Sequence, residues 1–163
     1  MVTQQLEKAI EELVVLLADS NPYLRRLTRM MLMNLGVKSI YETGDGVSAI
    51  DAIRHVNPDV MIVDWDMPVL DGREVMRIVR SPGVFPKASL PIIMLTDQGL
   101  QSRVTEAIRL GVHELLVKPI SPKTLQQRLL GIILYPRPLV WAGKFYIPMP
   151  RRRVALNDFV HAA

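Results

Sequence analysis

The sequence predicts an α/β fold, in which a five-stranded parallel sheet is doubly wound by helices and followed by an extended basic tail. Five short runs rich in Val, Ile and Leu recur between residues 12 and 134, and each is followed by a stretch with helical spacing of apolar residues. Strands that are apolar throughout are typical of parallel sheets buried by helices on both faces. The 163 residues therefore divide into an N-terminal extension (1–11), one domain (12–134) and a tail (135–163).

Local signals place the elements in order. The run LVVLLA at 13–18 is too short for a buried helix and predicts the first strand. Ser20 or Asn21 can cap the next helix, Pro22 suits its first turn, and Gly36 ends it. Residues 1–11 are expected to add a short amphipathic helix. Further strands are expected at 37–43, 59–64, 91–96 and 113–118, and further helices at 46–56, 72–80, 100–111 and, after a cap at Ser121, 122–134.

Composition excludes several classes of protein. With 49% apolar and 22% charged residues, the chain has the composition of a soluble globular protein. No apolar run is long enough to cross a membrane, and the N-terminus lacks the basic start of a secretory signal. The absence of cysteine excludes disulfides and thiolate metal sites and fits a cytoplasmic location. His55 and His113 have no partner at a metal-ligand spacing, so we expect them to be surface or capping residues.

Polar residues close four of the predicted strands. Asp19 and Asp64 end two of them, Thr96 ends a third and Lys118 a fourth. The carboxyl ends of parallel strands meet at one edge of the sheet, where doubly wound folds carry their sites. Two carboxylates are suitable ligands for Mg²⁺, and a hydroxyl and an ammonium group can contact phosphoryl oxygens. Taken singly, each residue is better explained as a cap, a turn or a solvated loop residue; the combination indicates a site.

These residues lie in segments that resemble a known family. The resemblance is to response-regulator receiver domains, which have the CheY-like, flavodoxin-like fold, and it covers about residues 12–134. Such domains transmit signals and do not turn over a small-molecule substrate, so an enzyme is not expected. The segments that carry it are ADSNP (18–22), VDWDMPVLDG (63–72), IIMLT (92–96) and LVKPI (116–120).

The resemblance implies a role for each residue. Asp64 is expected to accept a phosphoryl group from a histidine kinase or a phosphotransfer protein. Asp19, Asp64 and the backbone carbonyl of Asp66 are expected to hold Mg²⁺. Thr96 is expected to be the hydroxyl that moves toward the phosphoryl group, and Lys118 the lysine of the site, joined to Pro119 by a cis bond.

The sequence departs from the family pattern at three positions. Ala18 replaces one of two acidic residues after the first strand, which should weaken Mg²⁺ binding. Asp97 follows the switch hydroxyl, where a small residue is usual; it either adds a negative charge near the phosphoryl group or replaces the missing acid. Leu115 takes the place of the aromatic switch residue, so the usual coupling of hydroxyl and aromatic ring is not expected.

The tail carries the whole positive excess of the chain. Residues 1–134 hold 15 basic and 15 acidic side chains, so the net charge of +4 arises from residues 135–163. A localised basic excess indicates a particular anionic partner. Prolines at four positions favour an extended conformation. The cations are Arg137, Lys144, Arg151, Arg152 and Arg153, opposed by Asp158 alone.

The tail resembles the arginine-rich extension of a subset of stand-alone CheY-like proteins that bind cyclic di-GMP and act on flagellar motors. On that resemblance the ligand-binding residues are Arg137, Trp141, Arg151, Arg152 and Arg153. Guanidinium groups can pair with phosphates and with guanine edges, and aromatic rings stack on bases. The expected function is therefore a stand-alone receiver that binds cyclic di-GMP through its tail and docks on the motor or another effector.

Two alternatives remain open from the sequence. The first is a conventional receiver driven by phosphorylation of Asp64, whose tail aromatics only pack on the domain. The second is a tail that binds nucleic acid or an anionic membrane surface, although a net charge of +4 is small for such a partner. The sequence contains no helix-turn-helix and no apolar span, so neither DNA binding nor membrane insertion is expected.

Overall fold

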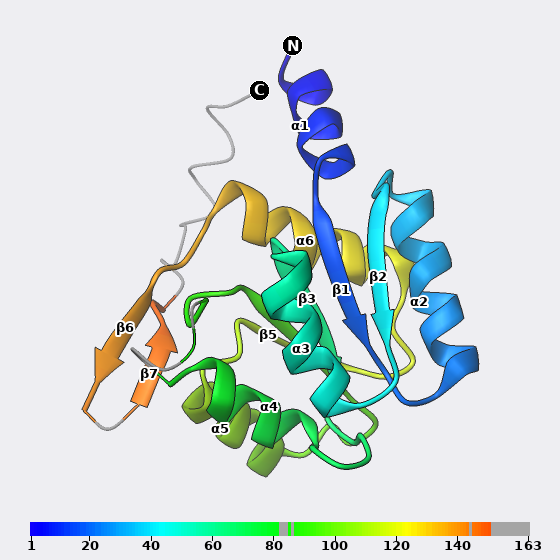
Figure 1. Ribbon diagram of the computed structural model, residues 1–163. Helices are drawn as coiled ribbons and strands as arrows, with labels where there is room; N and C mark the ends of the chain where they lie inside the picture. The colour runs from blue at the N-terminus through cyan, green and yellow to red at the C-terminus, as the bar shows by residue number, and fades with distance from the viewer. Residues whose placement is uncertain (82–84, 86, 144, 151–163) are drawn as a thin grey trace.

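A five-stranded parallel sheet forms the centre of the domain, in the strand order β2-β1-β3-β4-β5 (Figure 1). The computed structural model describes residues 1–81, 85, 87–143 and 145–150. The order reverses between β1 and β3, so the sheet is doubly wound as predicted. The bounds differ from the predicted ones by one or two residues: β1 is Val14–Ala18, β2 Ser39–Thr43, β3 Val60–Asp64, β4 Ile92–Thr96 and β5 Glu114–Val117.

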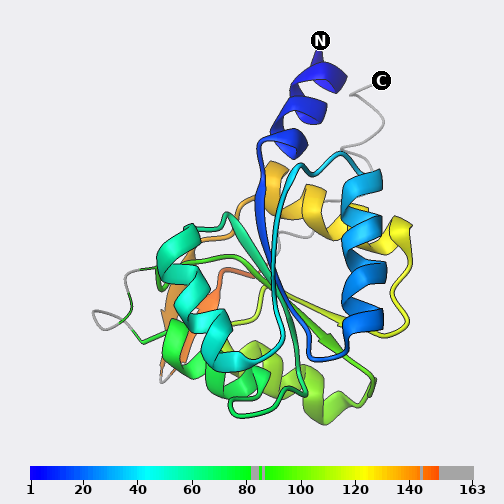
Figure 2. The same cartoon turned by 45° about the vertical axis from the view of Figure 1, so that its right-hand side comes forward.

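Helices cover both faces of the sheet (Figure 2). Alternate residues of each strand point to opposite faces, so every central strand contributes to two apolar clusters. One cluster packs against α3, α4 and α5, and the other against α2, α6 and the end of α1. The bounds are α1 Val2–Glu11, α2 Pro22–Asn34, α3 Gly46–Val56, α4 Gly72–Val79, α5 Gln101–Leu110 and α6 Pro122–Leu134. Among the described residues, none of the helices combines the length and the apolar character needed to cross a membrane.

Side-chain caps fix where helices begin after the strands. The Asn21 side chain accepts hydrogen bonds from the backbone N–H groups of Tyr23 and Leu24 at 3.0 and 3.1 Å, which resolves the choice between Ser20 and Asn21. Asp71 and Glu74 form a reciprocal capping box at the start of α4. Because the caps hold the loops at the carboxyl edge of the sheet, they also hold the strand-end polar residues.

In its described residues (135–143 and 145–150), the tail contains two extended segments, and these pair with each other. Strands β6 (Leu139–Ala142) and β7 (Phe145–Pro148) form an antiparallel hairpin beside α5 (Figure 1). The hairpin packs against α5 through β7, and Arg109 of that helix lies 6.0 Å from the centroid of the Phe145 ring. The predicted ligand residues Arg151, Arg152 and Arg153 lie outside the described residues.

Three residues, Arg80, His113 and Arg137, join the hairpin to the domain, and we call them the hairpin anchor. His113 is 8% exposed, so its prediction as a surface or capping residue was wrong. Its Nδ1 lies 3.3 Å from the Ile92 N–H and 3.3 Å from Arg80 Nη2, and its Nε2 lies 3.3 Å from the Arg137 carbonyl oxygen. Two donors at Nδ1 and an acceptor at Nε2 define a neutral ring with its proton on Nε2.

The arginines of the anchor bond mainly to carbonyl groups. Arg80 donates to the Gly111 carbonyl oxygen from Nε at 3.2 Å and to the Ala88 carbonyl oxygen from Nη1 at 2.7 Å. Arg137 donates to the His113 carbonyl oxygen and lies 3.5 Å from Glu114 Oε1. Burial, followed by the charge of Arg80, lowers the pKa of His113 to about 4. The ring is therefore neutral at physiological pH.

Candidate phosphoryl-acceptor site

The structure brings together the four polar residues predicted at the strand ends. The Lys118 ammonium lies 3.0 Å from Asp64 Oδ1 and 3.8 Å from Asp19 Oδ2. Thr96 closes β4, the strand that pairs with both β3 and β5. Asp19, Asp64 and Thr96 are all buried, with 1%, 5% and 0% exposure. The carboxyl edge of the sheet therefore holds a compact polar site, and we call these four residues the acceptor pocket.

Backbone contacts orient the two side chains that flank Asp64. Asp19 Oδ1 accepts a hydrogen bond from the Asn21 N–H at 2.9 Å, which leaves Oδ2 facing Lys118. The Lys118 N–H donates to the Thr96 carbonyl oxygen at 2.7 Å, and the peptide bond to Pro119 is cis, as expected. Both contacts come from the loops directly after the strands, so the fold itself sets the geometry.

The electrostatics of the pocket favour a further cation. Burial raises the pKa of Asp64, the nearby charge of Asp19 adds to this, and Lys118 opposes both through a hydrogen bond and its charge. Asp19 Oδ2 is buried and has no hydrogen-bond partner among the described residues. Two carboxylates next to a single ammonium therefore leave negative charge in the pocket that Lys118 alone does not balance.

The residues present fit Mg²⁺. Mg²⁺ takes few protein ligands and completes its shell with water and phosphate oxygens. The pocket offers the Asp19 and Asp64 carboxylates, and the Asp66 carbonyl lies 3.5 Å from Ser20 Oγ, in the loop that follows Asp19. Within the part of the chain that the structure describes, no group of three His, Cys, Asp or Glu side chains could hold a metal. A metal here would depend on these two carboxylates, on the Asp66 carbonyl and on oxygen ligands from outside the protein.

The three departures from the family pattern have distinct surroundings. Ala18 is fully buried in the sheet and contributes no carboxylate. The Asp97 side chain is 66% exposed, and its Oδ1 lies 3.7 Å from Arg103 Nη1. Leu115 packs against the apolar cluster on the side of α3, α4 and α5. Asp97 thus faces a cation of α5, which gives no support to the idea that it replaces the missing acid.

Sequence reasoning missed two residues of this region, Trp65 and Arg103. Trp65 directly follows Asp64 and is 3% exposed. The Arg103 guanidinium carbon lies 4.7 Å from the centroid of the Trp65 ring, and its Nη1 donates to Thr96 Oγ1 at 2.7 Å. The available signal was the place of Arg103 in the first turn of the helix that follows Thr96.

The predicted tail residues fall into two groups. The Arg137 guanidinium bonds within the hairpin anchor and is 21% exposed. Trp141 is 63% exposed, and its ring centroid lies 6.1 Å from that of Tyr146 on the paired strand. Trp141 is therefore available to a ligand, whereas Arg137 is engaged in holding the hairpin to the domain.

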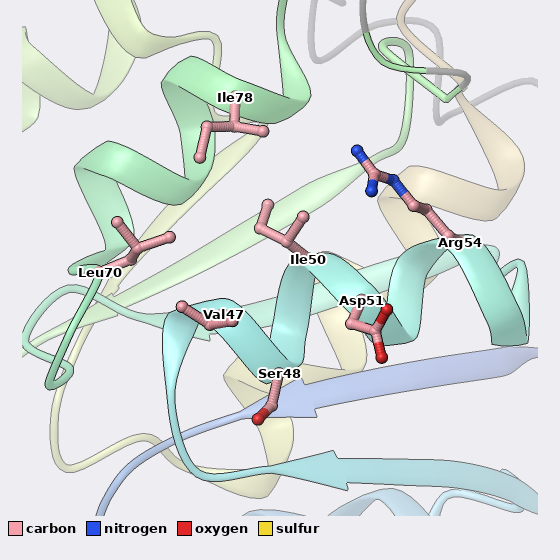
Figure 3. A pocket seen from close by; sticks show the side chains of 7 residues that line it. All are labelled: Val47, Ser48, Ile50, Asp51, Arg54, Leu70 and Ile78. Carbon is pink, nitrogen blue, oxygen red and sulfur yellow. The ribbon is translucent and has the colours of Figure 1, made fainter.

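A separate shallow groove of about 320 Å³ lies between α3 and α4 (Figure 3). It contains none of the four residues of the acceptor pocket. Its floor is apolar, and its charged residues, Asp51 and Arg54, stand at one side. The groove offers no convergent polar groups, so the candidate site remains the carboxyl edge of the sheet. The lining residues are Val47, Ser48, Ile50, Asp51, Arg54, Leu70 and Ile78.

The fold and the site define the class of protein. It is a doubly wound α/β domain that carries two carboxylates, a lysine and a hydroxyl group at the ends of its strands. The chain belongs to the family of response regulator receiver domains, whose model matches residues 15–130. Its relatives include the chemotaxis protein CheY1 of Helicobacter pylori, 33% identical over 116 residues that span 71% of this chain and 92% of that protein. A chemotaxis protein CheY homolog of Campylobacter jejuni is 32% identical over 120 residues, 73% of this chain and 91% of the relative.

Solved structures support the same assignment. The Vibrio cholerae chemotaxis protein CheY4 superposes with a TM-score of 0.64 at 30% identity, over 72% of this chain and 95% of that one. The receiver domain of a Pseudomonas aeruginosa sensor histidine kinase superposes with a TM-score of 0.65 at 28% identity, over 72% and 94% of the two chains. That neighbour has a magnesium ion coordinated in its active site cleft.

Proposed function

We propose that Asp64 accepts a phosphoryl group from a histidine kinase or a phosphotransfer protein. The observation that carries the proposal is the contact of 3.0 Å between Asp64 Oδ1 and the Lys118 ammonium, beside a buried Asp19 oxygen that has no hydrogen-bond partner among the described residues. Membership of the receiver family supports the same assignment. Under this proposal the protein carries a signal from the kinase to an effector.

The chemistry is an in-line displacement at phosphorus. A carboxylate oxygen of Asp64 forms a bond to the phosphorus atom while the bond from phosphorus to the donor's imidazole nitrogen breaks, and that nitrogen keeps the electron pair. Lys118 neutralises part of the charge on the phosphoryl group, and the Thr96 hydroxyl donates a hydrogen bond to one of its oxygens. Mg²⁺, held by Asp19, Asp64 and the Asp66 carbonyl, would neutralise charge on the phosphoryl oxygens.

Acetyl phosphate with Mg²⁺ tests this proposal on the full chain. We expect mass spectrometry to find one added phosphoryl group on Asp64 and none in Asp64→Asn. Asp51→Asn is the matched control: its side chain is 70% exposed on α3, outside the acceptor pocket, so this variant should still be modified. An unmodified wild-type protein under forcing concentrations of acetyl phosphate would remove the proposal.

A second function is favoured by the exposed rings of the hairpin. The tail is proposed to bind cyclic di-GMP, with Trp141 stacking on a base and Arg151–Arg153 pairing with phosphates and guanine edges. Trp141 is 63% exposed on a hairpin that the anchor holds to the domain, so its ring is accessible for stacking. Arg137, which the sequence assigned to the ligand, is proposed to act by holding that hairpin. Binding would in turn direct the protein to the flagellar motor or to another effector.

Calorimetric titration with cyclic di-GMP separates this function from that of a conventional receiver with a docked tail. We expect binding to be lost when Arg151–Arg153 are replaced by Ala and to be weakened in Trp141→Ala. Tyr135→Ala removes an aromatic side chain that is 68% exposed but lies before the hairpin, so this variant should bind as the wild type does. Asp64→Asn should also bind normally. Absence of binding at tens of micromolar would favour the conventional receiver.

A further inference from the structure

Arg103 reaches the acceptor pocket from the first turn of α5. Its Nη1 donates to Thr96 Oγ1 at 2.7 Å and lies 3.4 Å from Asp66 Oδ2. The guanidinium carbon stands 4.7 Å from the centroid of the Trp65 ring, and the side chain is only 16% exposed. The ring and the two oxygens thus hold a second cation of the region, after Lys118, beside the switch hydroxyl.

The contact fixes which way the Thr96 hydroxyl donates. A hydroxyl oxygen accepts up to two hydrogen bonds and donates one. Thr96 Oγ1 accepts from Arg103 at 2.7 Å and from the Gln98 N–H at 3.1 Å, so both of its acceptor sites are used. Among the described residues, the hydroxyl itself donates to the Gln98 carbonyl oxygen at 3.4 Å, a long contact. The hydroxyl proton is therefore available for a better acceptor, such as a phosphoryl oxygen.

The acidic partners of Arg103 hold it weakly. The side chains of Asp66 and Asp97 are 62% and 66% exposed, and ion pairs with exposed carboxylates contribute little to stability because water screens them. A phosphoryl group carries nearly two negative charges and offers oxygens that match the planar guanidinium. Exchange of a surface carboxylate for a phosphoryl oxygen is therefore favourable for Arg103.

We propose that Arg103 is a phosphoryl-binding residue of the acceptor pocket, which orients the Thr96 hydroxyl before transfer and bonds to a phosphoryl oxygen afterwards. The inference rests on the proposed phosphorylation of Asp64. It adds a cation from α5 to a pocket in which Ala18 has removed one carboxylate. The pocket thereby shifts part of the charge neutralisation from metal to protein.

Beryllofluoride, a stable mimic of the phosphoryl group, tests the inference in calorimetric titrations of the full chain with Mg²⁺ present. We expect Arg103→Gln to weaken beryllofluoride binding at least about tenfold, as loss of a charged hydrogen bond predicts. The affinity of Arg103→Lys should lie between those of the wild type and Arg103→Gln. Arg109→Gln is the matched control, because Arg109 lies on the same helix but faces Phe145, and this variant should bind as the wild type does.

Binding of Mg²⁺ alone separates a direct role from a structural one. Removal of a nearby positive charge strengthens the attraction of the carboxylates for a cation, so Arg103→Gln should bind Mg²⁺ more tightly while it binds beryllofluoride more weakly. A variant that weakened both would show a damaged pocket and would overturn the proposal, as would beryllofluoride binding equal to the wild type. If the wild type itself takes neither beryllofluoride nor phosphoryl groups, the function proposed for Asp64 fails first and the inference fails with it.

Discussion

The acceptor pocket and the hairpin anchor both bury charged side chains, but they satisfy them differently. In the pocket, Asp19 Oδ2 is buried and has no hydrogen-bond partner among the described residues. In the anchor, Arg80 donates to the carbonyl oxygens of Ala88 and Gly111 and contacts His113. Burial of a charge is costly unless other groups compensate for it. Asp19 Oδ2 has only the Lys118 ammonium at 3.8 Å beside it, so the pocket can accept a further ligand, whereas the polar groups of the anchor are already paired and form a structural joint.

The largest expected effect comes from a substitution that disrupts the packing of the hairpin on the domain. Gly111 has φ +85°, and a Cβ atom there would lie 2.6 Å from the Tyr146 carbonyl oxygen and 3.1 Å from Arg80 Nε. Gly111→Ala should lower the free energy of unfolding by about 3–4 kcal/mol through backbone strain and displacement of the hairpin. Urea denaturation measures the loss, and limited proteolysis should cut the tail of this variant first.

Gly131 supplies the matched control for that substitution. It lies within α6, and an added Cβ would meet no atom within 4 Å. Gly131→Ala should raise the free energy of unfolding by up to about 1 kcal/mol, because alanine is the better helix former. Equal losses in both variants would contradict the role assigned to the hairpin contact.

The next effect is a dependence of the free energy of unfolding on pH, which arises from the anchor. The pKa of His113 is about 4 in the folded protein, below its usual value near 6.5, so the unfolded chain binds the proton more readily. The contribution of His113 to stability is therefore complete above pH 6.5 and is lost as the pH falls toward 4, by up to about 3 kcal/mol. Urea denaturation across this range should show a shallower dependence in His113→Gln than in the wild type.

His55 supplies the matched control for this substitution, because it lies outside the anchor. His55 is exposed and contacts Asp51 of the preceding turn. His55→Gln should keep the pH dependence of the wild type. If His55→Gln and His113→Gln changed the slope equally, the dependence would not come from the anchor.

The smallest expected effect is a gain in stability, and it comes from a substitution in the acceptor pocket. Burial raises the pKa of Asp64, so the charged form of this side chain costs stability at neutral pH. Asp64→Asn should raise the free energy of unfolding by an amount within about 1 kcal/mol, the size of an ordinary substitution effect. Thermal denaturation at pH 7 checks the sign. A loss of stability would mean that the Lys118 contact outweighs the burial of Asp64.

The residues of the acceptor pocket could be predicted from the sequence, whereas those of the hairpin anchor could not. Asp19, Asp64, Thr96 and Lys118 were predictable because each ends a strand, and parallel strands bring their carboxyl ends together. The anchor was not, because Arg80 and Arg137 lie 33 and 24 residues from His113 and meet it only through tertiary packing.

Two further features were not predicted from the sequence, the contact made by Arg103 and the pairing of the tail strands. Arg103 was missed because its contact with Thr96 depends on the direction of a long side chain. The hairpin had a signal in Gly143, which lies between two apolar runs and has φ +65°. The sequence-based prediction gave more weight to the prolines and so went no further than an extended tail.

Of the two tryptophans of the chain, Trp65 lies beside the acceptor pocket and Trp141 lies on the hairpin that the anchor holds. Trp65 is 3% exposed beneath Arg103, whereas Trp141 is 63% exposed on β6. The molecule therefore carries a separate fluorescent reporter for each region, and Trp65→Phe or Trp141→Phe leaves only the other. A soluble quencher should reach Trp141 and spare Trp65, so events at the pocket and at the hairpin can be followed independently in the same solution.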